Sequence, residues 1–235
     1  MLSVLRSAAI VAALGLGMLA TPILADDPSP VPAQPAEEIM EGETSAEVEV
    51  SVAAENETVQ VGDMVKDFSL TDIDGKTHSL SDYEGKIVVL SWTNPDCPFI
   101  VDHNKKRTID ALAEKYADKD VVVLQIDSTH TGTTERLVNM REEYDVKSPI
   151  LEDYDGSIGR YFGAKTSPHV FVIDTEGKLV YSGAIDNAPM GKLNDGESEN
   201  VNYAEAVVED LLAGREVSYS TTKPYGCSVK YADAP

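Results

Sequence analysis

The fold of this 235-residue chain is decided by one stretch, Trp92-Thr-Asn-Pro-Asp-Cys97-Pro98-Phe-Ile100. An apolar, β-branched run at 86–91 precedes it and predicts a buried strand. Apolar residues recur at helical spacing after it, which predicts one helix over 99–116. The apolar face of that helix comprises Ile109, Leu112 and Tyr116. Cys97 therefore stands where a strand passes into a helix, and Pro98 takes the first helical position, where its missing N–H is tolerated.

This position predicts a reactive thiol. A sulfur at the start of a helix faces unpaired backbone N–H groups and the positive end of the helix dipole, which both favour the thiolate. The thiolate is the nucleophilic form of cysteine. We therefore expect the Cys97 sulfur to be held as an anion within reach of solvent.

The same stretch resembles the active-site turn of the thioredoxin superfamily, and residues 94–99 most resemble its peroxiredoxin-like, AhpC/TSA-type redoxin branch. Three further stretches are similar to that branch: the lead-in segment at 68–86, Ser167-Pro168 before a strand at 170–174, and the hairpin partner at 176–183. The resemblance covers about residues 61–215. It implies an α/β thioredoxin fold, a central mixed sheet flanked by helices, with an N-terminal β-hairpin.

The remaining segments alternate between strand and helix patterns. Predicted strands lie at 120–127, 149–151, 169–174 and 178–183, and predicted helices at 133–144, 157–162 and 203–212. Asp74-Gly75 is a hairpin turn signal. Alternating strands and helices predict a parallel sheet with right-handed crossovers, to which the late hairpin adds antiparallel strands.

Four regions are expected along the chain. Residues 1–25 have the features of a cleaved signal peptide, which predicts an exported, periplasmic or secreted protein; an uncleaved N-terminal anchor is the alternative. Residues 26–60 are Pro-rich and acidic without Lys or Arg, and we expect this linker to be disordered. Residues 61–215 form the thioredoxin-like redoxin domain, and residues 216–235 are a C-terminal tail that carries Cys227.

The net charge of −22 excludes some partners. Without a basic patch to neutralise phosphate, we expect neither nucleic acid nor an anionic membrane as a partner, beyond the export signal itself. We expect no cofactor and no metal. The four histidines are dispersed at His78, His103, His130 and His169, of which His169 reads as an ordinary strand residue.

The two cysteines leave three interpretations open. Cys97 and Cys227 are a permanent disulfide staple, as is common in exported proteins; or Cys97 attacks and Cys227 resolves; or Cys97 acts alone and an external thiol resolves it. A staple gives no reason to place one cysteine at a strand-to-helix turn, which favours a redox role.

The resemblance implies further site residues. Asn94 stands where peroxiredoxins carry Thr or Ser to hold the peroxide, and Ser167-Pro168-His169 lacks the arginine that they use beside the cysteine. Thioredoxin-like thiol–disulfide enzymes have a cis-proline in that place, where the strand edge pairs with substrate backbone. Their second cysteine, however, is replaced here by Ile100. The predicted catalytic residues are therefore Cys97, Cys227, Asn94 and Pro168.

These observations predict an exported thiol-based oxidoreductase. Cys97 attacks a peroxide, which gives a sulfenic acid, or a disulfide, which gives a mixed disulfide. An external, thioredoxin-like thiol reductant completes the cycle. The alternatives are a thiol–disulfide exchange protein acting on protein disulfides, and a non-catalytic thioredoxin-fold binding module with a structural Cys97–Cys227 disulfide.

Overall fold

The computed structural model describes residues 58–233. The predicted signal peptide at 1–25 and most of the predicted linker at 26–60 lie outside this range. Among the described residues, no helix has the length and apolar character needed to span a bilayer.

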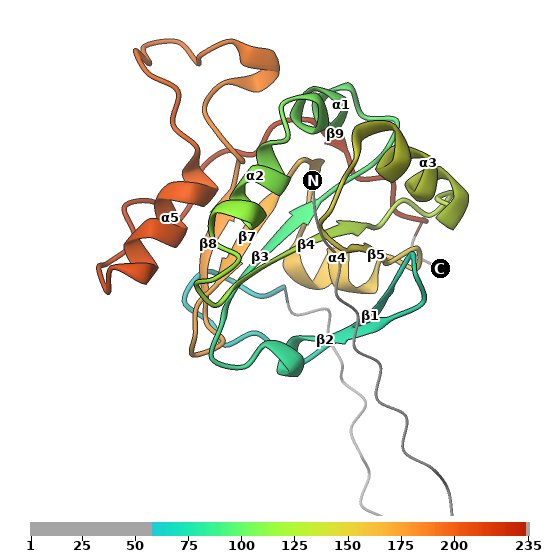
Figure 1. Cartoon of the computed structure of the whole chain (residues 1–235), viewed down its shortest axis with the longest axis horizontal. Helices are drawn as coiled ribbons and strands as arrows, with labels where there is room; N and C mark the ends of the chain where they lie inside the picture. Colours follow the sequence, from blue (N-terminus) through green and yellow to red (C-terminus); the bar gives the residue numbers. More distant parts are fainter. Residues whose placement is uncertain (1–57, 234–235) are drawn as a thin grey trace, which may run out of the picture. The chain divides into compact units, whose positions relative to one another are not determined.

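A seven-stranded mixed sheet forms the centre of the domain, in the order β2-β1-β5-β4-β3-β7-β8 (Figure 1). Its strands are β1 Ser69–Asp72, β2 Thr77–Ser79, β3 Ile87–Trp92, β4 Val121–Asp127, β5 Ile150–Glu152, β7 Val170–Ile173 and β8 Leu179–Gly183. β4 pairs in parallel with both β3 and β5, and the other pairings are antiparallel. Every residue of β3 is buried, as expected for a strand covered on both faces.

Within residues 58–233, five α-helices flank the sheet: α1 Pro98–Lys105, α2 Thr108–Lys115, α3 Thr134–Tyr144, α4 Ser157–Phe162 and α5 Tyr203–Leu212. Two short 3-10 helices lie at Leu80–Tyr83 and Pro189–Gly191. Because side chains alternate along a strand, Val89 of β3 packs in the cluster with α2 and α5, whereas Leu90 packs with Phe162 of α4. The predicted fold class, an α/β thioredoxin fold with a mixed sheet and flanking helices, is confirmed.

The single helix predicted over 99–116 is wrong in one respect, because it is broken between α1 and α2. Arg107 has a φ of 55°, in the left-handed region, and its N–H donates to Asn104 O at 2.9 Å. Its guanidinium bonds Glu114 of α2 at 2.5 Å. The break falls in a polar run with no apolar side chain to bury, and the predicted apolar face beyond it is buried.

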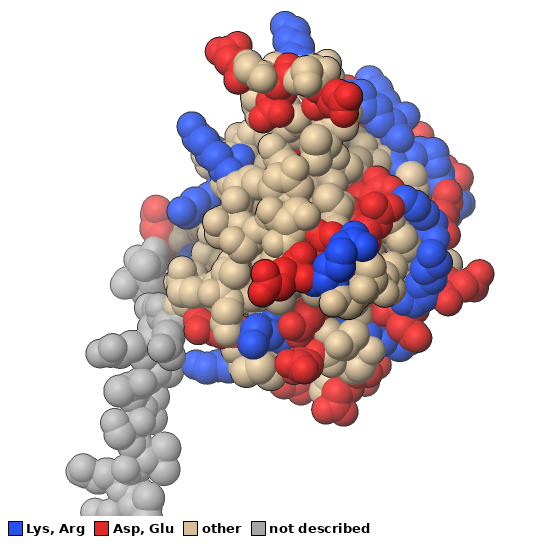
Figure 2. Space-filling model, turned by 90° about the vertical axis from the view of Figure 1, so that its left-hand side faces the viewer, with Lys and Arg blue, Asp and Glu red and all other residues tan. Residues whose placement is uncertain are grey.

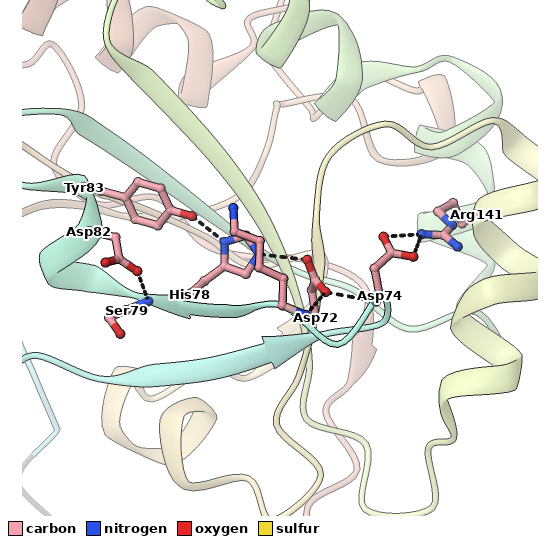
Figure 3. Close-up of polar contacts among 8 residues, drawn as sticks. Asp72, Asp74, His78, Ser79, Asp82, Tyr83 and Arg141 are labelled. Atoms are coloured by element: carbon pink, nitrogen blue, oxygen red, sulfur yellow. Dashed lines mark hydrogen bonds and ion pairs between the residues drawn. The ribbon is translucent and has the colours of Figure 1, made fainter. Parts of the chain in front are cut away.

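The predicted hairpin before the core is present as β1 and β2, and a buried carboxylate organises it (Figure 3). Asp72 accepts two N–H groups of the turn, each at 2.9 Å, and lies 2.8 Å from His78 Nε2. The other ring nitrogen of His78 bonds the Tyr83 hydroxyl. Burial raises the pKa of Asp72, but the bonds from His78 and the turn outweigh it, so the pKa is lowered overall. Asp74 links the hairpin to α3 through Arg141, at 2.7 and 2.8 Å.

Charged side chains of both signs share the surface of the domain. On the face in Figure 2, Lys and Arg lie next to Asp and Glu around a broad uncharged area. One such group joins α2 to α5, where Lys115 Nζ lies 2.5 Å from Glu205 and 2.8 Å from Glu209. Exposed pairs of this kind contribute at most about 1 kcal/mol each.

Candidate active site

Cys97 lies at the junction that the sequence predicts, between β3 and α1. It is the N-cap residue of α1, with Pro98 as the first helical residue. The Cys97 N–H donates to Asn94 O at 3.0 Å, which closes the turn, and the Cys97 carbonyl accepts the Val101 N–H at 3.0 Å. The sulfur is thus attached to a rigid element, because the strand before it is buried throughout.

The Asn94 side chain is engaged inside this turn. Its Nδ2 donates to Thr129 Oγ1 at 2.8 Å, and its Oδ1 accepts the Asp96 N–H at 2.8 Å. Thr129 is in turn fixed by Asp127 at the end of β4, whose Oδ1 accepts the Thr129 N–H at 2.9 Å. Asn94 therefore ties the Cys97 turn to the end of β4.

The Ser167–Pro168 peptide bond is cis, as the resemblance implied. Ser167 belongs to a short strand, β6 Thr166–Ser167, outside the main sheet. The Cys97 thiol donates to the Ser167 carbonyl oxygen at 2.9 Å. The structure therefore brings Cys97 and Pro168 together, although 70 residues separate Cys97 from Ser167.

The C-terminal tail completes the site. β9 Cys227–Ser228 pairs antiparallel with β6, with Cys227 opposite Ser167. Figure 1 shows β9 beside α1, and Cys227 packs against the cluster that contains Cys97. Gly226 has a φ of 126°, and a Cβ at this position would lie 2.1 Å from Ser167 O. Only glycine allows the tail to approach β6 this closely.

Most of the domain that holds this site matches a known protein family. The AhpC/TSA family model matches residues 61–182, which is more than half of the chain. The chain belongs to the AhpC/TSA family.

Relatives of this AhpC/TSA protein include thiol-disulfide oxidoreductases. The protein named thiol-disulfide oxidoreductase ResA from Bacillus cereus is 28% identical over 127 residues, 54% of this chain and 71% of that protein. The thioredoxin-like protein YneN of Bacillus subtilis is 29% identical over 126 residues, 52% of this chain and 69% of that protein. With its family, these relatives make the protein an oxidoreductase of the thioredoxin superfamily that works by thiol chemistry.

Solved structures agree on the fold of this AhpC/TSA protein. A hypothetical protein from Sinorhizobium meliloti 1021 is 26% identical with a TM-score of 0.64, covering 75% of this chain and 97% of that one. An uncharacterized conserved protein from Geobacillus kaustophilus has a TM-score of 0.66 at 24% identity, covering 76% and 95%. The second likeness shows the fold alone.

Both cysteines of this AhpC/TSA protein are free thiols in this structure. Burial is the main cause that raises the pKa of Cys227 to about 11, and the neighbouring Cys97 raises it further. Cys227 is therefore protonated at neutral pH while it faces Cys97. It needs to lose a proton before it can attack as a thiolate.

The expectation that the Cys97 sulfur is within reach of solvent is wrong. Cys97 is only 2% exposed. The physical reason is packing: Cys97 lies in a buried cluster with Ile100, Leu137 and Met140, and Cys227 of the tail packs against the same cluster. The sulfur is therefore enclosed by the core on one side and by the tail on another.

Sequence reasoning missed the residues that anchor this tail. Tyr225 contacts His103 and Asp186, and the Tyr231 hydroxyl donates to Ala164 O at 2.8 Å. A signal for them is present, because tyrosines recur every six residues at 219, 225 and 231 in the segment expected to be a tail. Aromatic rings bury large areas and rarely recur in a segment that is not packed.

His169 is a structural residue, as the sequence analysis expected. It is 4% exposed, its ring packs on Phe171 at 4.3 Å, and its Nδ1 accepts the Lys165 N–H at 3.1 Å. Burial, with a smaller effect of Lys165, lowers the pKa of His169 to about 4. His169 is therefore neutral at physiological pH and supplies no positive charge to the site. Over residues 58–233, no three His, Cys, Asp or Glu side chains are grouped as metal ligands would be.

Proposed function

We propose that this AhpC/TSA-family protein is a thiol–disulfide oxidoreductase in which Cys97 and Cys227 form the working couple. One observation carries the proposal: β9 places Cys227 opposite Ser167 while the Cys97 thiol bonds the Ser167 carbonyl. The tail thus brings a second sulfur to Cys97 along the edge beside the cis-proline, where a disulfide-bearing segment can pair by strand addition. The names of the ResA relatives support the same chemistry.

The proposed reaction consists of two exchanges. The Cys97 thiolate attacks one sulfur of a substrate disulfide, which forms a mixed disulfide and releases one substrate thiolate. The Cys227 thiolate then attacks Cys97 Sγ, which forms the Cys97–Cys227 disulfide and releases the second substrate thiolate. An external thiol reductant of the thioredoxin type returns both cysteines to thiols by the same exchange.

A disulfide is favoured over a peroxide as the substrate. Asn94, which stands where peroxiredoxins hold the peroxide, is engaged with Thr129 and Asp96. His169, in the stretch where they carry an arginine, is uncharged and packed against Phe171. We therefore assign Asn94 to holding the Cys97 turn. Pro168 shapes the edge that the substrate contacts.

The proposal also includes the place of the reaction and the parts of the chain. The leader at 1–25 supports export to the periplasm or the exterior, where protein disulfides occur. The segment 61–215 would be the thioredoxin-like domain, 26–60 a tether to it, and 216–235 the tail that delivers Cys227.

The test compares wild type with Cys97→Ser and Cys227→Ser on a disulfide-linked peptide. We expect the wild type to release two peptide thiols and form the internal disulfide, detected by mass. Cys227→Ser should accumulate the peptide on Cys97, Cys97→Ser should do neither, and Ser228→Ala, the neighbouring residue of β9, should behave as wild type. A wild type that consumes hydrogen peroxide with a thiol donor but ignores the peptide disulfide would overturn the assignment.

A further inference from the structure

Tyr225 connects the tail to the helix that begins at Cys97. It lies two residues before Cys227, and its ring faces two residues of α1. The ring stacks on His103 at 6.1 Å with an angle of 26° and contacts Phe99 at 5.8 Å. The segment that carries one cysteine is thereby held against the helix that carries the other.

The hydrogen bonds of Tyr225 have a defined direction. The Tyr225 hydroxyl donates its single proton to Asp186 Oδ1 at 2.5 Å. In the hydrogen bond with His103, the Tyr225 oxygen is therefore the acceptor. The His103 Nε2–H is therefore the donor, at 2.9 Å, and His103 Nδ1 accepts from Thr108 Oγ1 at 3.1 Å. The chain Thr108–His103–Tyr225–Asp186 satisfies both ring nitrogens and the hydroxyl.

Two members of this network are buried. His103 is 3% exposed and Asp186 is 7% exposed. Burial lowers the pKa of His103, partly opposed by Asp186, so the ring is neutral at physiological pH. Burial and the bond to Asp186 raise the pKa of Tyr225, which remains a phenol. Buried hydrogen bonds to a carboxylate are among the stronger ones in proteins.

The strand contact alone is too small to fix Cys227. β9 has two residues, and the preceding Gly226 is the residue type with the greatest backbone freedom, so other contacts are needed to hold the segment. On the N-terminal side, Thr222 accepts the Ala184 N–H at 2.9 Å, and the anchor nearest to Cys227 is the Tyr225 side chain. We propose that Tyr225, held by His103 and Asp186, is the positioning residue that sets Cys227 against Cys97. This inference rests on the proposed thiol–disulfide function.

The step under test is closure of the internal disulfide. With oxidised glutathione as the oxidant, Cys97 forms a mixed disulfide and releases one glutathione thiolate. The Cys227 thiolate then attacks Cys97 Sγ, forming the internal bond and releasing the second glutathione. At equilibrium, the ratio of internal disulfide to mixed disulfide multiplied by the concentration of reduced glutathione gives the effective concentration of Cys227 at Cys97.

The informative variant is Tyr225→Phe, which keeps the stacked ring and removes the hydroxyl. We expect its effective concentration to fall about ten- to a hundredfold, the range for a lost hydrogen bond to a charged group. Asp186→Asn, which keeps an acceptor without the charge, should fall by less. Tyr219→Phe removes a hydroxyl from the same tail, where the ring packs on Tyr203 at 4.7 Å, and should match wild type.

A second measurement separates positioning from general loss of structure. In the Cys227→Ser background, the rate at which Cys97 attacks oxidised glutathione should stay the same or rise with Tyr225→Phe, because a looser tail uncovers the sulfur. The inference would be overturned if Tyr225→Phe slowed both the formation of the mixed disulfide and the closure of the internal disulfide. It would also be overturned if Tyr225→Phe kept the wild-type effective concentration. Either outcome leaves the thiol–disulfide function intact. A wild type that never forms the internal disulfide would overturn both.

Discussion

The two segments that bring sulfur to the site are held in different ways. Cys97 follows β3, which is buried along its whole length, and begins α1. Cys227 lies in β9, which has two residues and touches the molecule through the β6 edge and through side chains such as Tyr225 and Tyr231. One sulfur is therefore fixed inside the hydrophobic core, whereas the other is held at its edge, by side chains that pack on the core from outside and by hydrogen bonds. This difference implies that the position of Cys227 can be altered without unfolding the domain.

A change in the core that supports Cys97 should have the largest effect on stability. Leu90 is 0% exposed and packs in the cluster with Trp92 and Phe171. Leu90→Ala leaves a cavity beside Trp92 and Phe171 and should lower the free energy of unfolding by about 2–5 kcal/mol, measured by urea unfolding of the reduced protein. Leu212→Ala, at a position 39% exposed, is the matched control and should stay within about 0.5 kcal/mol of wild type. Equal losses of stability in the two variants would mean that the β3 core does not support the Cys97 turn more than an exposed helix position does.

The support of the Cys97 turn also includes a buried carboxylate, Asp127, which makes the stability of the domain depend on pH. Burial raises the pKa of Asp127 from 3.8 to about 6, against the opposing hydrogen bonds from Thr129. The folded protein holds this proton more tightly than the unfolded chain. Its contribution to stability is therefore complete below pH 3.8 and is lost as the pH rises through about 6.

Asp127→Asn removes that titration and leaves an oxygen that can accept the Thr129 N–H. Between pH 4 and pH 8, wild type should lose up to about 3 kcal/mol of stability relative to this variant, measured by unfolding at each pH. The contrasting variant is Asp67→Asn. Hydrogen bonds from Ser81 lower the pKa of Asp67, so wild type should gain stability relative to it as the pH rises. If the stability difference between wild type and Asp127→Asn did not change with pH, the raised pKa of Asp127 would be contradicted.

A change that weakens docking of the tail should have the smallest effect on the stability of the domain. In Gly226→Ala the new Cβ meets the Ser167 carbonyl, at a φ of 126° that alanine rarely adopts. We expect docking of the tail to weaken by about 1–2 kcal/mol, roughly a 5- to 30-fold lower effective concentration of Cys227. The free energy of unfolding of the core should not change.

A matched glycine separates backbone strain from the contact with Ser167. Gly214 also has a positive φ, 65°, but a Cβ there meets no atom within 4 Å. Gly214→Ala should therefore leave the internal disulfide unaffected. Equal effects at Gly214 and Gly226 would show that the close approach to β6 is not what holds the tail.

The features that could be predicted from the sequence are those with local causes. β-branched runs mark the central strands, and Pro98 after Cys97 marks the start of α1, since these signals depend on residues next to one another. The break at Arg107 was missed, because a left-handed non-glycine residue has no reliable local signal. The tail itself was predicted, but its packing over the site was missed for a different reason. His103 and Tyr225 are 122 residues apart, and the covering of Cys97 depends on such contacts.

The closed position of β9 has a consequence for selectivity. A segment tethered to its own binding edge competes at a local concentration of the millimolar order. For the proposed reaction, a substrate segment must displace β9 from the β6 edge before its disulfide reaches Cys97. The tail thereby sets a minimum affinity for turnover, and segments that bind the β6 edge weakly are excluded as substrates.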